Sequence, residues 1–202
     1  MKLGILADIH EHTRRLQKAI AVLQEHGAER FVVLGDVFDT GKRIEQTVRQ
    51  LLDVRAEGVW GNHDVALCLD AGDEAWDRYG ADVLDFMGRL RPSLELGGCL
   101  FTHVEPWIDP HRVEDLWDVH DSPDSPEKLA RSFAAVPHRV MFTGHLHRWL
   151  VGTPDGLLPW RGQEPVCLET GSRYLVVVHA VWQGRCALFD TETNYLTPFG
   201  ER

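Results

Sequence analysis

Five short apolar runs of the chain are each followed by side chains that can bind a metal ion. The runs are LGILA, FVVLG, GVWG, CLFT and VMFTG. The side chains that follow them are, in chain order, Asp8 and His10, Asp36, Asn62 and His63, His103, and His145 and His147. Imidazole nitrogens with carboxylate or amide oxygens, and no thiolate, favour Mn²⁺, Fe or Zn²⁺ over an iron–sulfur cluster or a pure calcium site. All five runs end in this way, which exceeds chance and predicts a metal site.

The sequence GHLH (144–147) ends the last run with two histidines two residues apart. In a strand, residues two apart point to the same face, so His145 and His147 could form half of a metal site. Two ordinary polar residues at a strand end are the alternative, and this pair alone does not decide between them. The eight candidate residues exceed the need of one tetrahedral site. Two metals about 3.5–4 Å apart, bridged by one carboxylate, would use them, with the two histidines on neighbouring metals.

Alternating strand and helix patterns in the first half of the chain would bring these residues together. Apolar runs at 2–7, 30–35 and 59–61 predict strands, and amphipathic stretches at 14–27 and 43–58 predict helices that end at glycines. This alternation is typical of βαβ units and a mainly parallel sheet. Ligands of such sheets bind beyond the carboxyl ends of the strands, so the five ends could meet in one crevice.

The second half of the chain predicts two hairpins, a helix and a long loop. Residues 93–103 predict a hairpin that turns at a Gly-Gly pair, and residues 173–193 predict another that turns at a Gln-Gly pair. Residues 125–136 begin with a capping-box-like pattern and predict a helix. The segment 104–126, rich in Pro, Asp and Trp, predicts a functional loop, with surface padding as the alternative. His120 of this loop is expected at the surface.

Length and composition limit the class of protein. The 202 residues are enough for a full core, and without repeats or an obvious linker we expect a single domain over 1–202. The net charge of −10 disfavours a binder of long nucleic acid but not of a nucleotide or short phosphoester. No apolar run approaches a membrane span, and MKLGILADIH reaches charged residues too early for a signal peptide, so a cytoplasmic protein without a membrane partner is expected. Four cysteines without CxxC spacing suggest no disulfide framework or zinc ribbon.

Five sequence blocks together resemble the calcineurin-like metallophosphoesterases. The blocks are DIH (8–10), GDVFD (35–39), GNHD (61–64), THVEP (102–106) and GHLH (144–147). Each block is common alone, but all five in this order and approximate spacing are highly specific. The resemblance implies an α/β fold of two facing mixed β-sheets flanked by helices, a four-layer α/β/β/α sandwich.

The resemblance also implies a dinuclear metal centre and a role for each matched residue. One ion would be bound by Asp8, His10 and His147, the other by Asn62, His103 and His145, with Asp36 bridging both. Mn²⁺ is the expected ion, with Fe and Zn²⁺ as alternatives. The ions would activate water for attack on phosphorus and neutralise the phosphoryl oxygens. His63 would stabilise the transition state or protonate the leaving group, and Asp39 would orient it through a hydrogen bond.

Three residues depart from the patterns of relatives. Thr40 stands where the protein Ser/Thr phosphatases of the superfamily carry an arginine, which makes a protein phosphatase less favoured. Glu11 and His12 stand where many small bacterial members have Gly-Asn. We expect His12 to cap the following helix or support the metal ligands, with contact to the substrate phosphate as the alternative. Arg148, directly after the last ligand, could contact substrate or lie in solvent.

The resemblance therefore implies a metal-dependent phosphoesterase that hydrolyses P–O bonds. A phosphodiester or small nucleotide is the favoured substrate, and a phosphomonoester or dinucleoside polyphosphate is the alternative. A non-catalytic protein-binding scaffold is disfavoured because all eight candidate residues are present. The chain also contains several tryptophans near the blocks, namely Trp107, Trp117, Trp149 and Trp160. They could stack on a base or aryl group, although packing is the default role of tryptophan.

Overall fold

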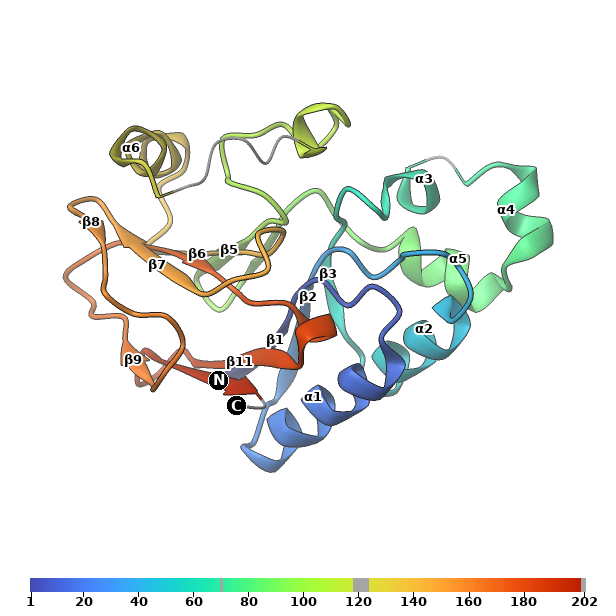
Figure 1. Ribbon diagram of the computed structural model, residues 1–202, viewed down its shortest axis with the longest axis horizontal. Coiled ribbons are helices and arrows are strands. Elements are labelled where there is room, and N and C mark those ends of the chain that lie inside the picture. The colour runs from blue at the N-terminus through green and yellow to red at the C-terminus, as the bar shows by residue number, and fades with distance from the viewer. Residues whose placement is uncertain (70, 118–123, 201–202) are drawn as a thin grey trace.

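The strands form two six-stranded mixed sheets that pack face to face (Figure 1). The computed structural model describes residues 1–69, 71–117 and 124–200. The first sheet contains β1 (Lys2–Leu6), β2 (Arg30–Leu34), β3 (Glu57–Val59), β9 (Val166–Cys167), β11 (Arg185–Asp190) and β12 (Tyr195–Gly200). The second contains β4 (Leu94–Leu96), β5 (Cys99–Phe101), β6 (Val140–Thr143), β7 (Leu150–Thr153), β8 (Gly156–Leu157) and β10 (Tyr174–Val177). Their orders are β3-β2-β1-β11-β12-β9 and β4-β5-β6-β10-β7-β8.

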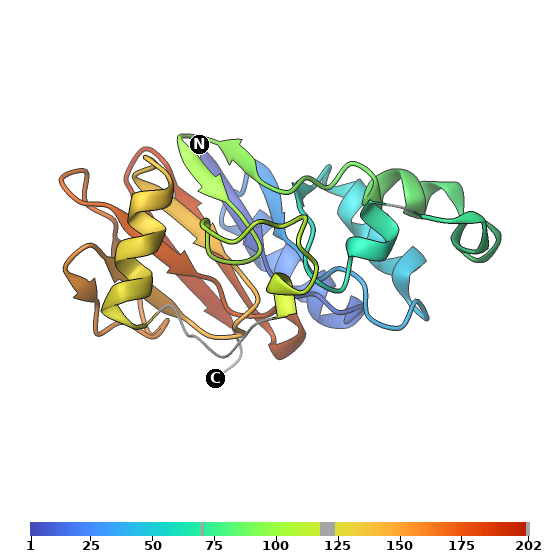
Figure 2. The same ribbon diagram turned by 90° about the horizontal axis from the view of Figure 1, so that it is seen from above.

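Helices cover the outer faces of both sheets (Figures 1 and 2). They are α1 (Thr13–Glu25), α2 (Ile44–Asp53), α3 (Val65–Cys68), α4 (Asp73–Arg78), α5 (Ala81–Met87) and α6 (Pro126–Ala135). Helices α1, α2 and α5 pack on the first sheet, whereas α6 packs on the second. The predicted four-layer α/β/β/α fold is therefore confirmed. Among the described residues, no helix is both long and apolar enough to cross a membrane.

The sequence pattern of each long helix explains the face that it buries. The buried residues of α1 recur at helical spacing and are Leu16, Ala19, Ile20 and Leu23. Helix α6 begins after Ser125, whose hydroxyl accepts a hydrogen bond from the Lys128 N–H at 3.2 Å. This contact satisfies an N–H of the first turn, as the capping pattern predicted.

Parallel pairing aligns the carboxyl ends of the strands that precede the candidate ligands. Strands β1, β2 and β3 are parallel neighbours in the first sheet, and β5 and β6 are parallel neighbours in the second. In β2, Val32 and Leu34 face the other sheet, whereas Phe31 and Val33 face the helices. The βαβ order predicted for the first half of the chain is thus confirmed, and the ligand-bearing ends share one edge of the molecule. The prediction of a mainly parallel sheet is wrong, because β11, β12 and β9 extend this sheet in antiparallel pairings. The predicted helix 43–58 is also too long, since α2 ends at Asp53 and Gly58 lies in β3.

Of the two predicted hairpins, one forms and one does not. Strands β4 and β5 form the hairpin expected within 93–103. The segment 173–193 contains β10 and β11, but β10 pairs with β6 and β7 while β11 pairs with β1 and β12. The chain crosses from one sheet to the other through a short 3₁₀ helix, η2 (Val181–Gln183). Local apolar pattern predicts a strand but not its partner, because the partner is chosen by packing between distant segments.

The predicted long loop 104–126 contains a short 3₁₀ helix, η1 (Asp115–Trp117). The structure describes this segment at 104–117 and 124–126. The prediction for His120 lies outside the described residues. The described part runs along the edge where the candidate ligands gather, because η1 brings Trp117 against the ring of His63 with a 5.0 Å separation of ring centroids.

Candidate metal centre

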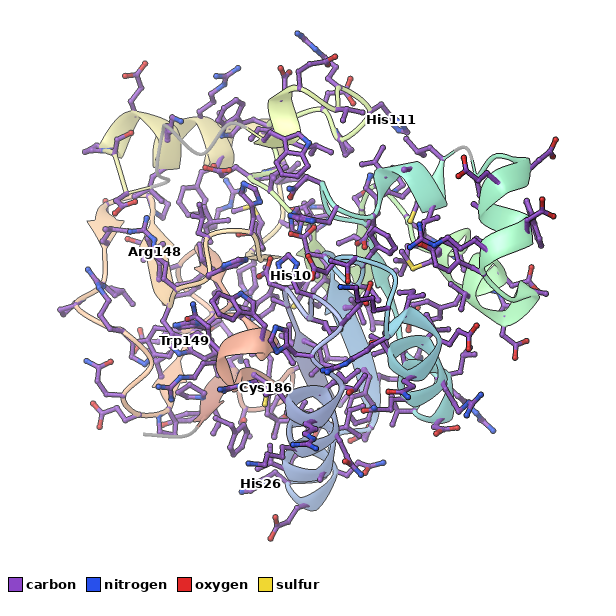
Figure 3. All side chains as sticks on the ribbon, turned by 45° about the vertical axis from the view of Figure 1, so that its right-hand side comes forward. His10, His26, His111, Arg148, Trp149 and Cys186 are labelled. Carbon is purple, nitrogen blue, oxygen red and sulfur yellow. The ribbon has the colours of Figure 1, made fainter. Side chains whose placement is uncertain are left out.

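The candidate ligands from five strand ends converge at the shared edge of the two sheets. Asp8 and His10 follow β1, Asp36 follows β2, Asn62 follows β3, His103 follows β5, and His145 and His147 follow β6. In Figure 3 His10 lies near the centre of the molecule, with Arg148 and Trp149 to one side of it. The first three strand ends come from one sheet and the last two from the other, so the site joins both halves of the sandwich.

The backbone at these ligands adopts a conformation that non-glycine residues rarely take. Eight non-glycine residues of the described chain have positive φ, and five of them are candidate ligands. These five are Asp8, His10, Asp36, His145 and His147, with φ between 46° and 66°. Sparsely populated backbone conformations cost about 1–3 kcal/mol each and cluster at functional sites. The rest of the fold must therefore offset this conformational cost to hold these side chains in place.

The two histidines of GHLH do not lie on a strand, which corrects the strand-alternation prediction. Strand β6 ends at Thr143, and both histidines follow it in a turn where the Leu146 N–H donates to the Gly144 carbonyl at 2.7 Å. Their positive φ values, not the pleat of a strand, direct their rings. His145 lies against His103, whereas His147 lies against Asp8.

A first cluster of possible ligands consists of Asp8, His10, Asp36 and His147, whose donor atoms all lie within 4.8 Å of one another. The Nε2 atom of His10 lies 3.6 Å from Asp36 Oδ2. The Nε2 atom of His147 lies 3.4 Å from Asp8 Oδ1. Both carboxylates are buried, so no bulk solvent screens their charge.

A second cluster consists of Asp36, His103 and His145, with the Asn62 amide beside it. His103 Nε2 lies 3.5 Å from Asp36 Oδ1, and Asn62 Oδ1 lies 2.9 Å from the same nitrogen. Nδ1–H of His103 donates to the Leu34 carbonyl at 2.6 Å, which leaves Nε2 with a lone pair for a metal. Asp36 belongs to both clusters and presents Oδ2 to the first and Oδ1 to the second.

The donor atoms of the two clusters fit divalent metal ions. The buried Nε2 of His10 has no hydrogen-bond partner within the described chain, which is uncommon for a buried polar atom. The separations of 3.4–3.6 Å between imidazole and carboxylate atoms are long for hydrogen bonds. They are close to the spacing of neighbouring ligands around one ion, about 3.0–3.4 Å when each ligand is about 2.1 Å from the metal.

Burial and neighbouring charges set the protonation states at the site. Burial lowers the pKa of His10 to about 4, and burial together with the nearby His103 lowers that of His145 to about 3. These two imidazoles are neutral at pH 7 and can offer lone pairs. Burial alone would lower the pKa of His147, but its contact with Asp8 raises it. Burial and the charge of Asp8 raise the pKa of Asp36 to about 7. A bound cation would stabilise the charged carboxylate and lower this pKa again.

A family model for the calcineurin-like phosphoesterase superfamily domain matches residues 1–178 of this chain. The chain belongs to the calcineurin-like phosphoesterase superfamily. Members of this superfamily bind divalent metals and act on small phosphoesters or nucleotides, so the two Asp/His clusters of this chain are its candidate metal-binding groups. A comparison with curated proteins finds no match.

Solved structures share the fold of this protein at low sequence identity. A metallophosphoesterase from Sphaerobacter thermophilus has a TM-score of 0.79 and 20% identity, covering 100% of this chain and 88% of that one. A novel archaeal phosphodiesterase has a TM-score of 0.57 and 15% identity, with 100% of both chains covered. Yfce, a phosphoesterase from E. coli, has a TM-score of 0.50 and 16% identity, again with 100% of both chains covered. At these identities the similarity shows the fold alone.

Gly61 allows the loop after β3 to approach Asp36 closely. A Cβ atom at position 61 would lie 2.1 Å from Asp36 Oδ1 and 2.6 Å from the Asp36 backbone nitrogen. Gly61→Ala is therefore expected to displace the shared carboxylate and to weaken Mn²⁺ binding by about 10-fold or more. Isothermal titration with Mn²⁺ measures the affinity of the variant and of the wild type. Gly72→Ala is the matched control, because a Cβ there meets nothing within 4 Å and should leave the affinity at the wild-type value.

Glu11 holds the loop that carries Asp39, a role that the sequence did not predict. Its buried carboxylate accepts hydrogen bonds from the backbone N–H groups of Asp39 at 3.1 Å, Gly41 at 2.5 Å and Arg43 at 2.8 Å. Asp64, fully buried, similarly accepts from the N–H groups of Phe38 and Gly61 at 2.9 Å each. The departure from Gly-Asn at positions 11 and 12 was the available signal in the sequence. The backbone N–H groups that bond the Glu11 carboxylate, however, lie 28–32 residues further along the chain.

Removing the Glu11 carboxylate should loosen this loop. Glu11→Ala is expected to lower the free energy of unfolding by about 3 kcal/mol, since three N–H groups lose a charged acceptor. Glu11→Gln retains one acceptor oxygen and should lose about half as much. Urea unfolding of the metal-free protein checks both values. The exposed Glu25→Ala in α1 serves as control, and equal stabilities of the Glu11 and Glu25 variants would contradict this role.

His63 lies beside the clusters with Asp39 and Trp117 as neighbours. Its ring is 4.8 Å from that of His10, and its backbone N–H donates to Asp36 Oδ1 at 3.1 Å. A donor atom of exposed Asp39 lies within 4.8 Å of those of His10 and His63. No hydrogen bond joins Asp39 and His63 within the described ranges, so the expected carboxylate–imidazole bond is not formed here. Trp117, 52% exposed, stands 5.0 Å from His63.

The two remaining predicted residues are His12, at the start of α1, and Arg148, before β7. His12 occupies the N-cap position of α1, but its side chain makes no capping hydrogen bond, so the capping prediction is wrong. Its ring lies 6.0 Å from Trp182, and the Nε1–H of Trp182 donates to His147 Nδ1 at 3.1 Å. This support of His147 was not predicted, because nothing in the local pattern around Trp182 marks it. Arg148 forms an ion pair with Asp124 at 2.5 Å.

The other tryptophans near the blocks pack within the protein. Trp149 and Trp160 are buried and contact each other with ring centroids 5.5 Å apart. Trp107 lies beneath the Arg131 guanidinium, 3.7 Å from the ring centroid. Packing, the default interpretation, therefore accounts for these three, and Trp117 is the one of the four that stands exposed beside the candidate metal centre.

Proposed function

We propose that this protein is a dinuclear-metal phosphoesterase that hydrolyses P–O bonds, with a phosphodiester or small nucleotide as favoured substrate. The observation that carries the proposal is Asp36, one buried carboxylate that presents a different oxygen to each of two ligand clusters. Asp8, His10 and His147 would complete one metal site, and Asn62, His103 and His145 the other. Mn²⁺ suits this mixture of nitrogen and oxygen donors, with Fe and Zn²⁺ as alternatives.

The residues around the clusters would bind the ester and move protons. When bound, two divalent ions would lower the pKa of water and neutralise charge on the phosphoryl oxygens. His63 lies next to the site without belonging to the metal set, so its imidazole can donate a proton to the leaving oxygen or a hydrogen bond to the phosphoryl group. A small rotation of the Asp39 side chain would let it accept a hydrogen bond from His63 and fix the ring. His12 and Arg148 are further candidates for contact with substrate.

The proposal includes a small-molecule substrate and a cytoplasmic location. An acidic chain with a net charge of −10 supports a small phosphoester over a long nucleic acid. All four cysteines are free thiols, which supports a reducing compartment. The complete donor set supports an enzyme over a non-catalytic scaffold.

Two aryl esters test the proposed reaction. Metal-stripped protein is assayed with a bis-aryl phosphodiester and an aryl phosphomonoester, with and without Mn²⁺. Faster cleavage of the diester, dependent on Mn²⁺, is the expected result. Preference for the monoester would overturn the substrate class, and hydrolysis unaffected by removal of metal would overturn the metal-dependent reaction itself.

A further inference from the structure

A cavity of about 320 Å³ lined by three arginines lies next to the candidate metal centre. Its wall includes Arg148, Arg161, Arg185, His179, Trp149 and Asp124, and we call it the arginine cavity. The first three come from separate segments of the chain, and the fold brings them to the wall of one cavity. In a chain with a net charge of −10, such a concentration of positive charge in one cavity requires an explanation.

The positive charge of the arginine cavity exceeds its negative charge. Asp124 is the only acidic residue among the described residues that line it, and it pairs with Arg148. The guanidinium of Arg185 forms no hydrogen bond or ion pair with the part of the chain that the structure describes, whereas its backbone N–H donates to the Ala180 carbonyl at 3.2 Å. Arg161 donates through Nη1 to two backbone carbonyls, those of Leu158 and Trp160. Two of the three guanidinium groups therefore lack a carboxylate partner within the described residues.

The fold holds Arg161 at the rim of the cavity by close packing. Gly162 has φ of +77°, and a Cβ atom there would lie 2.2 Å from Cδ1 of the Trp149 indole. The loop that carries Arg161 can therefore press directly onto Trp149, which is buried and forms an apolar wall. Arg161 is itself exposed, so its guanidinium lies at the rim, where a ligand from solvent can reach it, beside the buried indole wall.

The arginine cavity borders the metal centre through two segments. Arg148 directly follows the candidate ligand His147. After His179, the N–H groups of Val181 and Trp182 donate to the carbonyls of Ala7 and Asp8 at 2.7 and 3.2 Å. His179 lines the cavity, and its ring lies 6.0 Å from that of Trp149. Figure 3 shows Arg148 and Trp149 on the same side of His10.

We propose that the arginine cavity binds a second, non-scissile phosphate group of the substrate. The substrate class would then be a phosphoester that carries another phosphate at a distance from the scissile phosphorus. Guanidinium groups bind phosphate oxygens through paired, charge-assisted hydrogen bonds, and two of the three here lack a carboxylate partner among the described residues. The inference rests on the proposed function, because it places the scissile phosphate at the neighbouring metal centre.

Binding of inorganic pyrophosphate to the metal-stripped protein tests the cavity without the metal centre. Isothermal titration should show one site in the wild type, and Arg185→Gln should weaken it about tenfold or more. Arg89→Gln, which removes the same charge from an exposed position in another part of the surface, should bind as the wild type does. No binding to the wild type, or equal weakening by both variants, would overturn the proposal.

A matched pair of esters distinguishes a substrate phosphate from a separate phosphate ion. With Mn²⁺ added, the nitrophenyl ester of thymidine 5′-phosphate is compared with the same ester carrying a 3′-phosphate. The 3′-phosphate should lower KM about tenfold in the wild type and in Arg89→Gln, and Arg185→Gln should remove that advantage. Pyrophosphate binding with no KM advantage would show that the cavity takes a separate anion and overturn the proposal. Hydrolysis of neither ester, with pyrophosphate still bound, would instead show that the proposed function has failed.

Discussion

Asp36→Asn is expected to remove tight binding of Mn²⁺ and to lower hydrolysis by about 10³-fold or more. Asparagine keeps the size of the side chain but offers one neutral oxygen, so it cannot supply a charged ligand to both clusters. Asp36 is the residue whose two oxygens face different imidazoles, Oδ2 towards His10 and Oδ1 towards His103. Loss of either single-cluster ligand would leave the other ion its donors, whereas loss of Asp36 affects both.

In the metal-free protein, Asp36→Asn should not lower the thermal stability and is expected to maintain or raise it at high pH. Burial and Asp8 raise the pKa of Asp36 to about 7. A carboxyl group with a folded pKa above its unfolded pKa binds protons more tightly when folded, so the free energy of unfolding falls as pH rises from about 4 to about 7. The asparagine side chain of the variant carries no charge and avoids this loss. At pH 8, metal-free Asp36→Asn should therefore melt at or above the wild-type temperature.

Thermal melting with and without Mn²⁺ measures both effects together. Mn²⁺ should raise the Tm of the wild type, because it binds the folded state alone, and should leave that of Asp36→Asn unchanged. Asp53→Asn, at an exposed position of α2, is the matched control and should keep the wild-type increase. An equal increase in all three proteins would contradict the bridging role.

His63→Gln is expected to lower kcat by about 10²–10⁴-fold while Mn²⁺ still binds. His63 belongs to neither the first nor the second cluster, yet its ring is 4.8 Å from that of His10. It can therefore act on the substrate without being required for the ions. The exposed His111→Gln serves as control and should retain the wild-type kcat.

The leaving group separates the two roles open to His63. A proton donor matters most when the leaving oxygen is basic, so the loss in His63→Gln should be larger for an alkyl ester than for a nitrophenyl ester. A residue that stabilises the phosphoryl group in the transition state would give similar losses for both esters. Near-wild-type turnover with either ester would remove His63 from the reaction.

The sequence predicted the parts of the fold and site that depend on local pattern. Strand ends followed by Asp, Asn or His could be recognised because apolar runs and βαβ alternation are local signals, and parallel pairing then brings the ends together. The donor atoms of Asp8, His10, Asp36, His103, His145 and His147 do lie in two adjoining clusters. That arrangement follows from strand direction, which the alternation of strands and helices indicates.

Features that depend on distant packing could not be predicted in this way. The pattern of 173–193 contains two strands, but their separation into different sheets depends on the neighbours β6 and β1, which lie far away in the chain. The arginine cavity and the hydrogen bonds of Glu11 likewise bring together segments that are far apart in the chain. No common sequence pattern marks these segments as neighbours. The turn that holds His145 and His147 is set by positive φ values for which a strand-end pattern gives no signal.

The number of Mn²⁺ ions that hydrolysis requires tests the dinuclear centre most directly. Metal-stripped protein is titrated with Mn²⁺ while phosphodiester hydrolysis and the electron paramagnetic resonance spectrum are followed together. Two ions per chain, an exchange-coupled spectrum and a parallel rise in hydrolysis are expected, because Asp36 would join the two ions. Full hydrolysis at one ion per chain, or two ions without magnetic coupling, would contradict the claim that Asp36 bridges a dinuclear centre.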